Sequence, residues 1–204
     1  MQRQTKSNFK YDQTLADEYS LYSEFNQIYE FFIDTFLRVH GTPSGTLIDL
    51  CCGTGDVINK FKQQFPQLDV TGCDQSIEMI NASKYNGTLI HGDIDTITTV
   101  FDNVVSNNAY HHFDNIQDFW NTVYQITHSK SKILISDVIR PENEEDVLQI
   151  VNNVLGPNSM FETAFTLALT SAYTEDELKT HIGLLNLIIV DTPINNYKLF
   201  FIHN

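Results

Sequence analysis

Residues 47–55 read Leu-Ile-Asp-Leu-Cys-Cys-Gly-Thr-Gly, and a second apolar run, residues 68–73, ends at Asp74. The pattern predicts a buried strand, a glycine-containing turn that opens a helix, and a second strand that ends in a carboxylate. Gly53 and Gly55 allow the backbone to approach a ligand where a Cβ would clash. Asp74 follows Gly55 by 19 residues, close to the spacing of a carboxylate that binds ribose hydroxyls. The segment therefore predicts a nucleotide-like ligand at the carboxyl ends of parallel strands.

Two features distinguish this segment from a dinucleotide-binding turn. Such a turn has a third glycine three positions after Gly55, but Ile58 stands there. Asp49 would repel a pyrophosphate and suits a cationic group, such as an α-amino group. The segment resembles motif I of the class I S-adenosylmethionine-dependent methyltransferases, in the form found in the ubiquinone and menaquinone biosynthesis enzymes and their small-molecule relatives. That motif has a glycine where this chain has Cys51, a small residue that can replace glycine if its φ is negative.

The resemblance implies S-adenosylmethionine as the cofactor and gives roles to further residues. Asp93 matches the carboxylate that accepts the adenine amine, with the Ile94 N–H as a donor beside it. Asn107 would line the methionine end of the cofactor. Met79 could lie against the adenine or belong to the core, and both interpretations stay open. The predicted cofactor-binding residues are Tyr19, Asp49, Cys51, Gly53, Gly55, Asp74, Gln75, Met79, Asp93, Ile94 and Asn107.

A second similarity to the family places candidate catalytic residues after the fourth predicted strand. His111 and His112 match an aromatic-plus-histidine segment that faces the methyl-transfer region in relatives. A neutral imidazole could take a proton from an acceptor hydroxyl or amine, or it could only shape the pocket. Arg140 could bind an acceptor carboxylate, or it could form an internal ion pair with Asp137 or another neighbour. The predicted acceptor-binding residues are Tyr11, Asp137 and Arg140.

Apolar runs alternate with helical segments, which predicts a parallel sheet covered on both faces. The last two strands are joined by a short Pro-Ile-Asn-Asn turn at 193–196 and should form an antiparallel hairpin. The resemblance implies the same α/β fold, a Rossmann-like, seven-stranded and mostly parallel sheet in a single domain, 1–204. The predicted strands are 46–51, 69–74, 87–91, 102–107, 132–138, 186–191 and 197–203.

Two helical additions to the repeating unit are expected to act as lids over the ligand, or else only to cover the sheet. The N-terminal cap, residues 11–39, contains an amphipathic helix at 25–39 with an aromatic face. It also contains Tyr11 and Tyr19, which match an aromatic–acidic…aromatic signature of the family, in which Tyr19 covers the cofactor. The second addition, residues 140–185, is too long for a single crossover helix and contains several helical faces.

Composition narrows the classes of partner. The chain of 204 residues has a formal charge of −14 and a pI near 4.6, which argues against nucleic acid and against an anionic membrane surface. No apolar run approaches the ~20 residues of a membrane span, and the N-terminus lacks a signal-peptide core. Three cysteines form no disulfide framework, so a cytoplasmic protein is expected, as a monomer or homodimer. No metal site is expected, because ligand spacing is absent.

These features together predict an enzyme that transfers a methyl group from S-adenosylmethionine to a small-molecule acceptor. In-line displacement on a sulfonium depends mainly on positioning, so it needs at most one general base. Two alternatives stay open. One is a protein that binds the cofactor without transfer, such as a cyclase or a regulatory module. The other is a nicotinamide-dependent oxidoreductase, which Ile58 and the absence of a Tyr-x-x-x-Lys pair disfavour.

Overall fold

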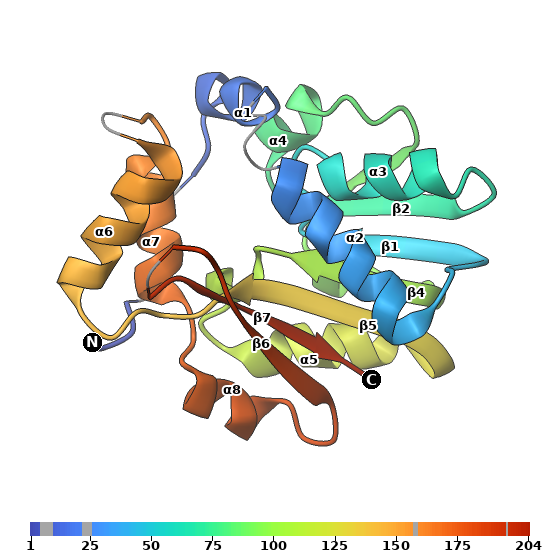
Figure 1. Cartoon of the computed structure of the whole chain (residues 1–204). Coiled ribbons are helices and arrows are strands. Elements are labelled where there is room, and N and C mark those ends of the chain that lie inside the picture. Colours follow the sequence, from blue (N-terminus) through green and yellow to red (C-terminus); the bar gives the residue numbers. More distant parts are fainter. Residues whose placement is uncertain (5–9, 22–25, 157–158, 195) are drawn as a thin grey trace. The chain divides into compact units, whose positions relative to one another are not determined.

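The computed structural model describes residues 1–4, 10–21, 26–156, 159–194 and 196–204. Its strands form one seven-stranded sheet in the order β3-β2-β1-β4-β5-β7-β6 (Figure 1). The last two strands pair antiparallel, so the expected fold class is confirmed. The strands are β1 (Thr46–Leu50), β2 (Asp69–Asp74), β3 (Thr88–His91), β4 (Phe101–Asn107), β5 (Thr127–Val138), β6 (Asn186–Asp191) and β7 (Lys198–His203).

The chain divides by its internal contacts into two compact units. The first comprises residues 10–107 and 117–134, and the second comprises residues 1–9, 108–116 and 135–204. Among the residues expected to belong to helices or to the hairpin turn, Phe25, Pro157 and Asn195 lie outside the described residues.

In the first unit, the sheet changes direction between β1 and β4. From β1 the chain crosses to β2 and then to β3 on one side, whereas β4 pairs parallel with β1 on its other side. Crossovers between parallel strands are right-handed, so helices that follow the two directions cover opposite faces. Asp49 lies at this junction, with Gly72 beside it on β2 and Val105 beside it on β4. The junction is the usual ligand-binding position of an open parallel sheet.

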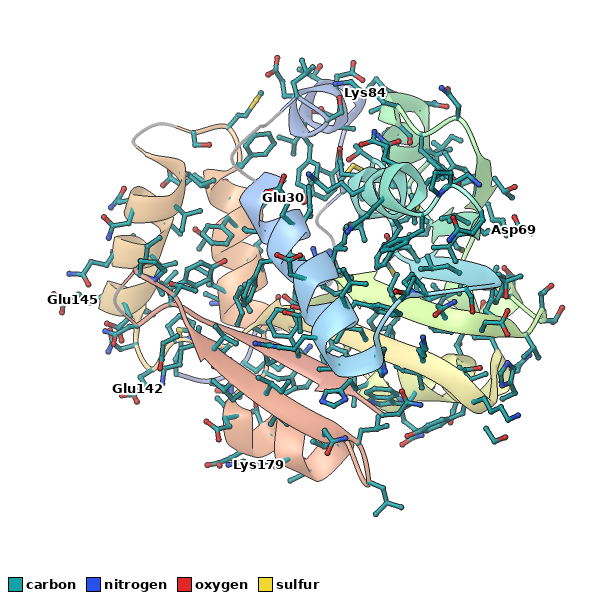
Figure 2. All side chains as sticks on the ribbon, turned by 45° about the vertical axis from the view of Figure 1, so that its right-hand side comes forward. Glu30, Asp69, Lys84, Glu142, Glu145 and Lys179 are labelled. Carbon is teal, nitrogen blue, oxygen red and sulfur yellow. The ribbon has the colours of Figure 1, made fainter. Side chains whose placement is uncertain are left out.

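The helices of the first unit bury their apolar faces against the sheet. The aromatic residues of the expected helix at 25–39 do form such a face in α2, where Phe32 and Phe36 are fully buried. Phe36 also packs edge-on against Phe61 of α3, with ring centroids 5.4 Å apart. Charged side chains labelled in Figure 2, among them Glu30 and Asp69, project from the surface. The helices are α1 (Gln13–Tyr19), α2 (Asn26–His40), α3 (Asp56–Gln64), α4 (Ile77–Ala82) and α5 (Ile116–Gln125).

The second unit contains the helices that the sequence predicted after the fifth strand. Helix α6 (Glu144–Leu155) ends at Gly156, whose φ is 73°. Helix α7 (Glu162–Ser171) follows, and α8 (Glu175–His181) begins with a capping box, in which Thr174 and Glu177 bond each other's backbone N–H groups. None of the helices in the described ranges is long and apolar enough to cross a membrane.

Strand β5 begins at Thr127, earlier than the predicted start at residue 132. The first residues of the strand are polar and mostly exposed, so they lack the apolar pattern that marks a buried strand. Ser131 is buried and supplies the local order: its hydroxyl donates to the Phe101 carbonyl at 2.6 Å and accepts from the His128 N–H at 2.9 Å. Such hydrogen bonds between distant residues leave no periodic signal in the sequence.

Candidate functional site

Asp74 ends β2 and fastens the glycine-containing turn. Its Oδ2 accepts the Gly53 N–H at 2.7 Å, and its Oδ1 accepts the Ser76 N–H at 2.8 Å. The side chain is buried, which raises the pKa of the carboxyl group, while the hydrogen bonds from Ser76 and Gly53 act to lower it. A carboxylate oxygen has two lone pairs, so each oxygen can still accept a bond from a ribose hydroxyl.

The turn after β1 passes through three left-handed residues. The φ values of Gly53 and Gly55 are 55° and 77°, which glycine adopts without strain. Cys51 also has a positive φ, 58°. The expectation that Cys could replace the motif's glycine at a negative φ is therefore wrong, and this position has the conformation that favours glycine. An added Cβ at Gly53 would have only the Met79 methyl group within 4 Å, at 3.9 Å, so the backbone there borders open space.

Asp49 is a buried carboxylate for which the described residues supply no cation. Only 2 % of the residue is exposed, and within the described part of the chain its Oδ1 has no hydrogen-bond partner. Burial raises its pKa well above the usual range, and the negative charge of Asp74 raises it further. A buried unpartnered oxygen is costly, and a positively charged donor would relieve the cost. The arrangement therefore fits the α-amino group that the sequence assigned to this position.

Three tyrosines from α1, the residues before it and α2 gather near this turn. The rings of Tyr11 and Tyr19 pack edge-on with centroids 5.9 Å apart, and the Tyr29 hydroxyl donates to the Tyr19 hydroxyl at 3.4 Å. Burial raises the pKa of Tyr11, with further contributions from Tyr19 and from Asp74. Helix α1 packs on α4, and Lys84, which follows α4, donates through Nζ to the carbonyl of Ser20 at the end of α1, at 3.0 Å. Helix α1 thus lies against the helix that follows Asp74.

Asp93 and Ile94, which were assigned to the adenine, follow β3, and Gln75, which was assigned to the cofactor, follows β2. Asp93 is exposed and precedes a 3-10 turn, Ile94–Thr96, in which Ile94 is buried. Gln75 is exposed, and its carbonyl lies 3.2 Å from His91 Nε2. The Gly92 N–H donates to the Asp74 carbonyl at 3.0 Å, which brings the carboxyl ends of the two strands together.

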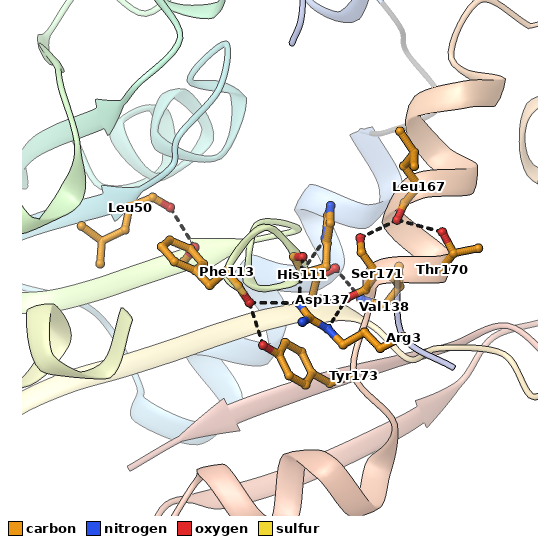
Figure 3. A network of polar contacts seen from close by, with 11 residues as sticks. Arg3, Leu50, His111, Phe113, Asp137, Val138, Leu167, Thr170, Ser171 and Tyr173 are labelled. Carbon is orange, nitrogen blue, oxygen red and sulfur yellow. Dashed lines mark hydrogen bonds and ion pairs between the residues drawn. The ribbon is translucent and has the colours of Figure 1, made fainter. Parts of the chain in front are cut away.

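Met79 and Asn107 lie at two other edges of the same turn. Met79 is 6 % exposed and its methyl group faces Gly53, a position compatible with both of its predicted roles. Asn107 is the last residue of β4 and is half-buried. The preceding Ser106 ties β4 to the motif, because its hydroxyl donates to the Leu50 carbonyl at 2.8 Å (Figure 3).

In the second unit, His111 and Asp137 form a buried dyad (Figure 3). Asp137 Oδ2 lies 2.8 Å from His111 Nδ1 and also accepts the His111 N–H at 2.9 Å. Its Oδ1 accepts the Val138 N–H at 2.7 Å. His112 is exposed, and its ring stacks on that of His111 with centroids 4.3 Å apart. Asp137, expected on the acceptor side, is thus occupied in orienting His111.

Arg140 is held by other residues than Asp137. Its Nη2 lies 2.7 Å from Glu177 Oε1, and its Nη1 donates to the Ala172 carbonyl at 2.9 Å. Burial acts to raise the pKa of Glu177, but the bonds from Arg140 and Thr174 outweigh it and lower the value. This pair favours the internal ion pair over contact with an acceptor, although an acceptor role for Arg140 stays a prediction.

Sequence reasoning missed two contributors to these sites. Tyr29 was assigned to the apolar face of a helix, yet its hydroxyl reaches Tyr19. Arg3 stands in a polar stretch without periodicity, yet its guanidinium contacts the segment that contains His111. Neither position carries a motif, so no sequence signal could have found them. Within the described residues, no three His, Cys, Asp or Glu side chains are arranged to hold a metal ion.

Comparison with known proteins gives consistent matches. Residues 48–130 match the family model described as a methyltransferase domain. The fold resembles that of the plantazolicin methyltransferase BpumL, crystallised with a triazolic desmethylPZN analog and SAH, with a TM-score of 0.69 and 15% identity over 94% of this chain and 89% of that one.

Two further solved structures share the fold over nearly their whole length. One is a putative S-adenosyl-L-methionine-dependent methyltransferase from Methanococcus maripaludis, with a TM-score of 0.65 and 16% identity over 98% of this chain and 96% of that one. The other is a SAM-dependent methyltransferase from Aquifex aeolicus, with a TM-score of 0.66 and 15% identity over 95% of this chain and 98% of that one.

Proposed function

We propose that the chain is an S-adenosylmethionine-dependent methyltransferase that acts on a small-molecule acceptor. Residues 48–130 match the model of a methyltransferase domain, and the fold resembles that of solved S-adenosylmethionine-dependent methyltransferases. The observation that carries the proposal is the buried Oδ1 of Asp49 beside the glycine-containing turn, which has no hydrogen-bond partner among the described residues. A nicotinamide cofactor offers no α-amino group for this carboxylate, and its pyrophosphate would be repelled by it.

The residues of the first unit would hold the cofactor by its three parts. Asp49 binds the α-amino group, and Asp74 accepts bonds from the ribose while it keeps the Gly53 turn in place. Asp93 accepts from the adenine amine. Tyr11 and Tyr19 present aromatic faces, which stabilise cations. S-Adenosylmethionine supplies a methyl group on a positively charged sulfur.

The His111–Asp137 dyad is the candidate base for the acceptor proton. Because Asp137 accepts from Nδ1, a neutral imidazole has its lone pair at Nε2, the nitrogen that would receive the proton. Asp137 would then stabilise the imidazolium that forms, as an orienting carboxylate does in other His–carboxylate pairs. His112 is exposed, whereas His111 is buried against Asp137, so His112 is the natural control for His111.

A small-molecule acceptor is supported by composition and by a structural neighbour. The charge of −14 opposes association with nucleic acid. BpumL was crystallised with a triazolic desmethylPZN analog and SAH. The predicted cap at 11–39 and addition at 140–185 would exclude water from the reacting atoms, which favours an enclosed acceptor.

The test is release of S-adenosylhomocysteine, followed by mass spectrometry, with S-adenosylmethionine and a panel of small phenols, amines and carboxylic acids. We expect acceptor-dependent release whose rate falls at low pH, and we expect His111→Asn to remove that pH dependence while His112→Asn retains it. Cofactor binding without release for any acceptor would instead support a regulatory module. Binding of NADH and not of S-adenosylhomocysteine would support an oxidoreductase.

A further inference from the structure

The guanidinium of Arg3 contacts both ends of residues 111–113, the histidine segment (Figure 3). Its Nη2 donates to the Phe113 carbonyl at 2.9 Å and lies 3.4 Å from the His111 carbonyl. The Arg3 Nε donates to the Ser171 carbonyl at 2.8 Å, at the end of α7. Two of the three carbonyls belong to residues 111–113 and the third belongs to α7, far away in the sequence, so this one planar group joins the two segments.

Tyr173 contacts both the Phe113 carbonyl and the Arg3 guanidinium. Its hydroxyl donates to the Phe113 carbonyl at 2.7 Å, so that carbonyl accepts from both Tyr173 and Arg3. The Arg3 guanidinium also lies over the Tyr173 ring, 4.2 Å from its centroid. Within the described part of the chain, the Arg3 guanidinium forms one long ion pair, with Asp114 at 3.8 Å. Carbonyl binding and ring stacking, rather than an ion pair, therefore fix the guanidinium.

The histidine segment is also held by Asp137, the carboxylate of the dyad. Residues Tyr110–His112 form a 3-10 turn, and Asp137 bonds both the backbone and the ring of His111. Asp137 fixes the N–H side of the turn, and Arg3 fixes carbonyls on its other side. The side chain of Arg3 is 15% exposed, so water competes weakly for these carbonyls. Together the two residues restrict where the His111 ring can lie.

We propose that Arg3 is a positioning residue for His111, acting through the His111 and Phe113 carbonyls. This inference rests on the proposed role of His111 as the base. Among the described contacts of Arg3, none is with a residue assigned to the cofactor. Its loss should therefore impair proton transfer and leave cofactor binding unchanged. A fold-stabilising role alone would instead lower the fraction of folded protein, without changing the properties of the molecules that remain folded.

The experiment compares Arg3→Gln, Arg3→Lys and Arg38→Gln in the full-length protein. Arg38 lies exposed on α2, so its replacement makes the same charge change away from the segment. We expect Arg3→Gln to lower kcat by between about tenfold and a hundredfold, since displacement of a catalytic group by ~1 Å has effects of that size. The KM for S-adenosylmethionine should stay within about twofold. Lysine should restore little, because it lacks the planar fork that spans two carbonyls.

Two further measurements separate positioning from stability. In a His111→Asn background, Arg3→Gln should cause no additional loss of kcat. The ring of His111, followed by NMR in isotopically labelled protein, should titrate differently in Arg3→Gln and as in the wild type in Arg38→Gln. An equal loss of kcat in both backgrounds, or an unchanged His111 titration, would overturn the inference. Because the NMR titration needs no turnover, it decides the question even if no acceptor is methylated, in which case the proposed function fails separately.

Discussion

Replacement of Asp74 by alanine should damage both stability and cofactor binding. The residue is 8 % exposed and accepts the N–H groups of Gly53 and Ser76 at 2.7 and 2.8 Å. A strand-end carboxylate could be expected to be dispensable for folding, but these contacts argue otherwise. Alanine leaves two backbone donors without an acceptor, at about 1–3 kcal/mol each when buried. Water reaches part of the site, so the free energy of unfolding should fall by about 2–4 kcal/mol.

Cofactor affinity should fall in addition, by about 1.5–3 kcal/mol for a hydrogen bond to a charged group, which is roughly a 10- to 150-fold weaker Kd. The measurements are urea unfolding of the free protein and calorimetric titration with S-adenosylhomocysteine. Asp74→Asn keeps the volume of the side chain, but its NH₂ group would face one of the two donors, so it should restore stability only in part.

Asp93→Ala is the matched control, because Asp93 is an exposed carboxylate at the neighbouring strand end whose side chain makes no capping bond. It should weaken cofactor binding and change the free energy of unfolding by less than about 0.5 kcal/mol. If Asp74→Ala unfolds at the same urea concentration as the wild type, then Asp74 does not hold the turn and the argument from its contacts is refuted.

Three other predictions concern Asp49, Cys51 and Glu177. Because the pKa of Asp49 is raised in the folded protein, its contribution to stability is present below the unfolded value of about 3.9 and is lost as pH rises through the folded pKa. Binding of a ligand with an α-amino group should lower the pKa of Asp49 and release protons from its carboxyl group. Calorimetry in buffers of different ionisation enthalpy should therefore show proton release with S-adenosylhomocysteine in the wild type and none in Asp49→Asn. Methylthioadenosine, which lacks the α-amino group, should release none in either protein. Cys51→Gly should raise the free energy of unfolding by about 0.5–1 kcal/mol, because a left-handed L-residue costs about 1–2 kcal/mol and the conformational entropy of glycine offsets part of the gain. Cys52→Gly, at a buried position without positive φ, should lower the free energy of unfolding. Equal shifts of the two variants in thermal unfolding would contradict the assignment of strain to Cys51. Glu177→Ala should lower the free energy of unfolding by about 2–3 kcal/mol at neutral pH, because it removes the carboxylate bound to the buried Arg140 and a capping box. Since the pKa of Glu177 is lowered in the folded protein, the difference between variant and wild type in urea unfolding should shrink as pH falls below about 4. A difference that does not depend on pH would show that the ion pair contributes nothing.

The sheet could be predicted from the sequence because its strands are short apolar runs that end in polar residues. The positions of Asp74 and Asn107 at strand ends follow directly from that pattern. The early start of β5 could not be predicted, because residues such as His128 are exposed and polar, and their order comes from side-chain bonds to the neighbouring strand β4. Backbone dihedral angles could not be predicted from the sequence either, as the positive φ of Cys51 shows.

The candidate site likewise contains residues that the sequence could predict and contacts that it could not. Residues within a motif, such as Gly53 and Gly55, could be assigned because spacing along the chain sets their geometry. Pairings across the fold could not. His111 and Asp137 were both singled out, but their contact is a consequence of tertiary structure, and the same holds for Arg3 with Phe113.

The central claim is that the first unit binds S-adenosylmethionine by the ends of its parallel strands. The most direct test is calorimetric titration of the full-length protein with S-adenosylhomocysteine, with NADH as the competing ligand. The account predicts saturable binding of S-adenosylhomocysteine at one site per chain, weakened by Asp74→Ala, and no heat of binding with NADH. Saturable binding of NADH without any binding of S-adenosylhomocysteine would contradict it.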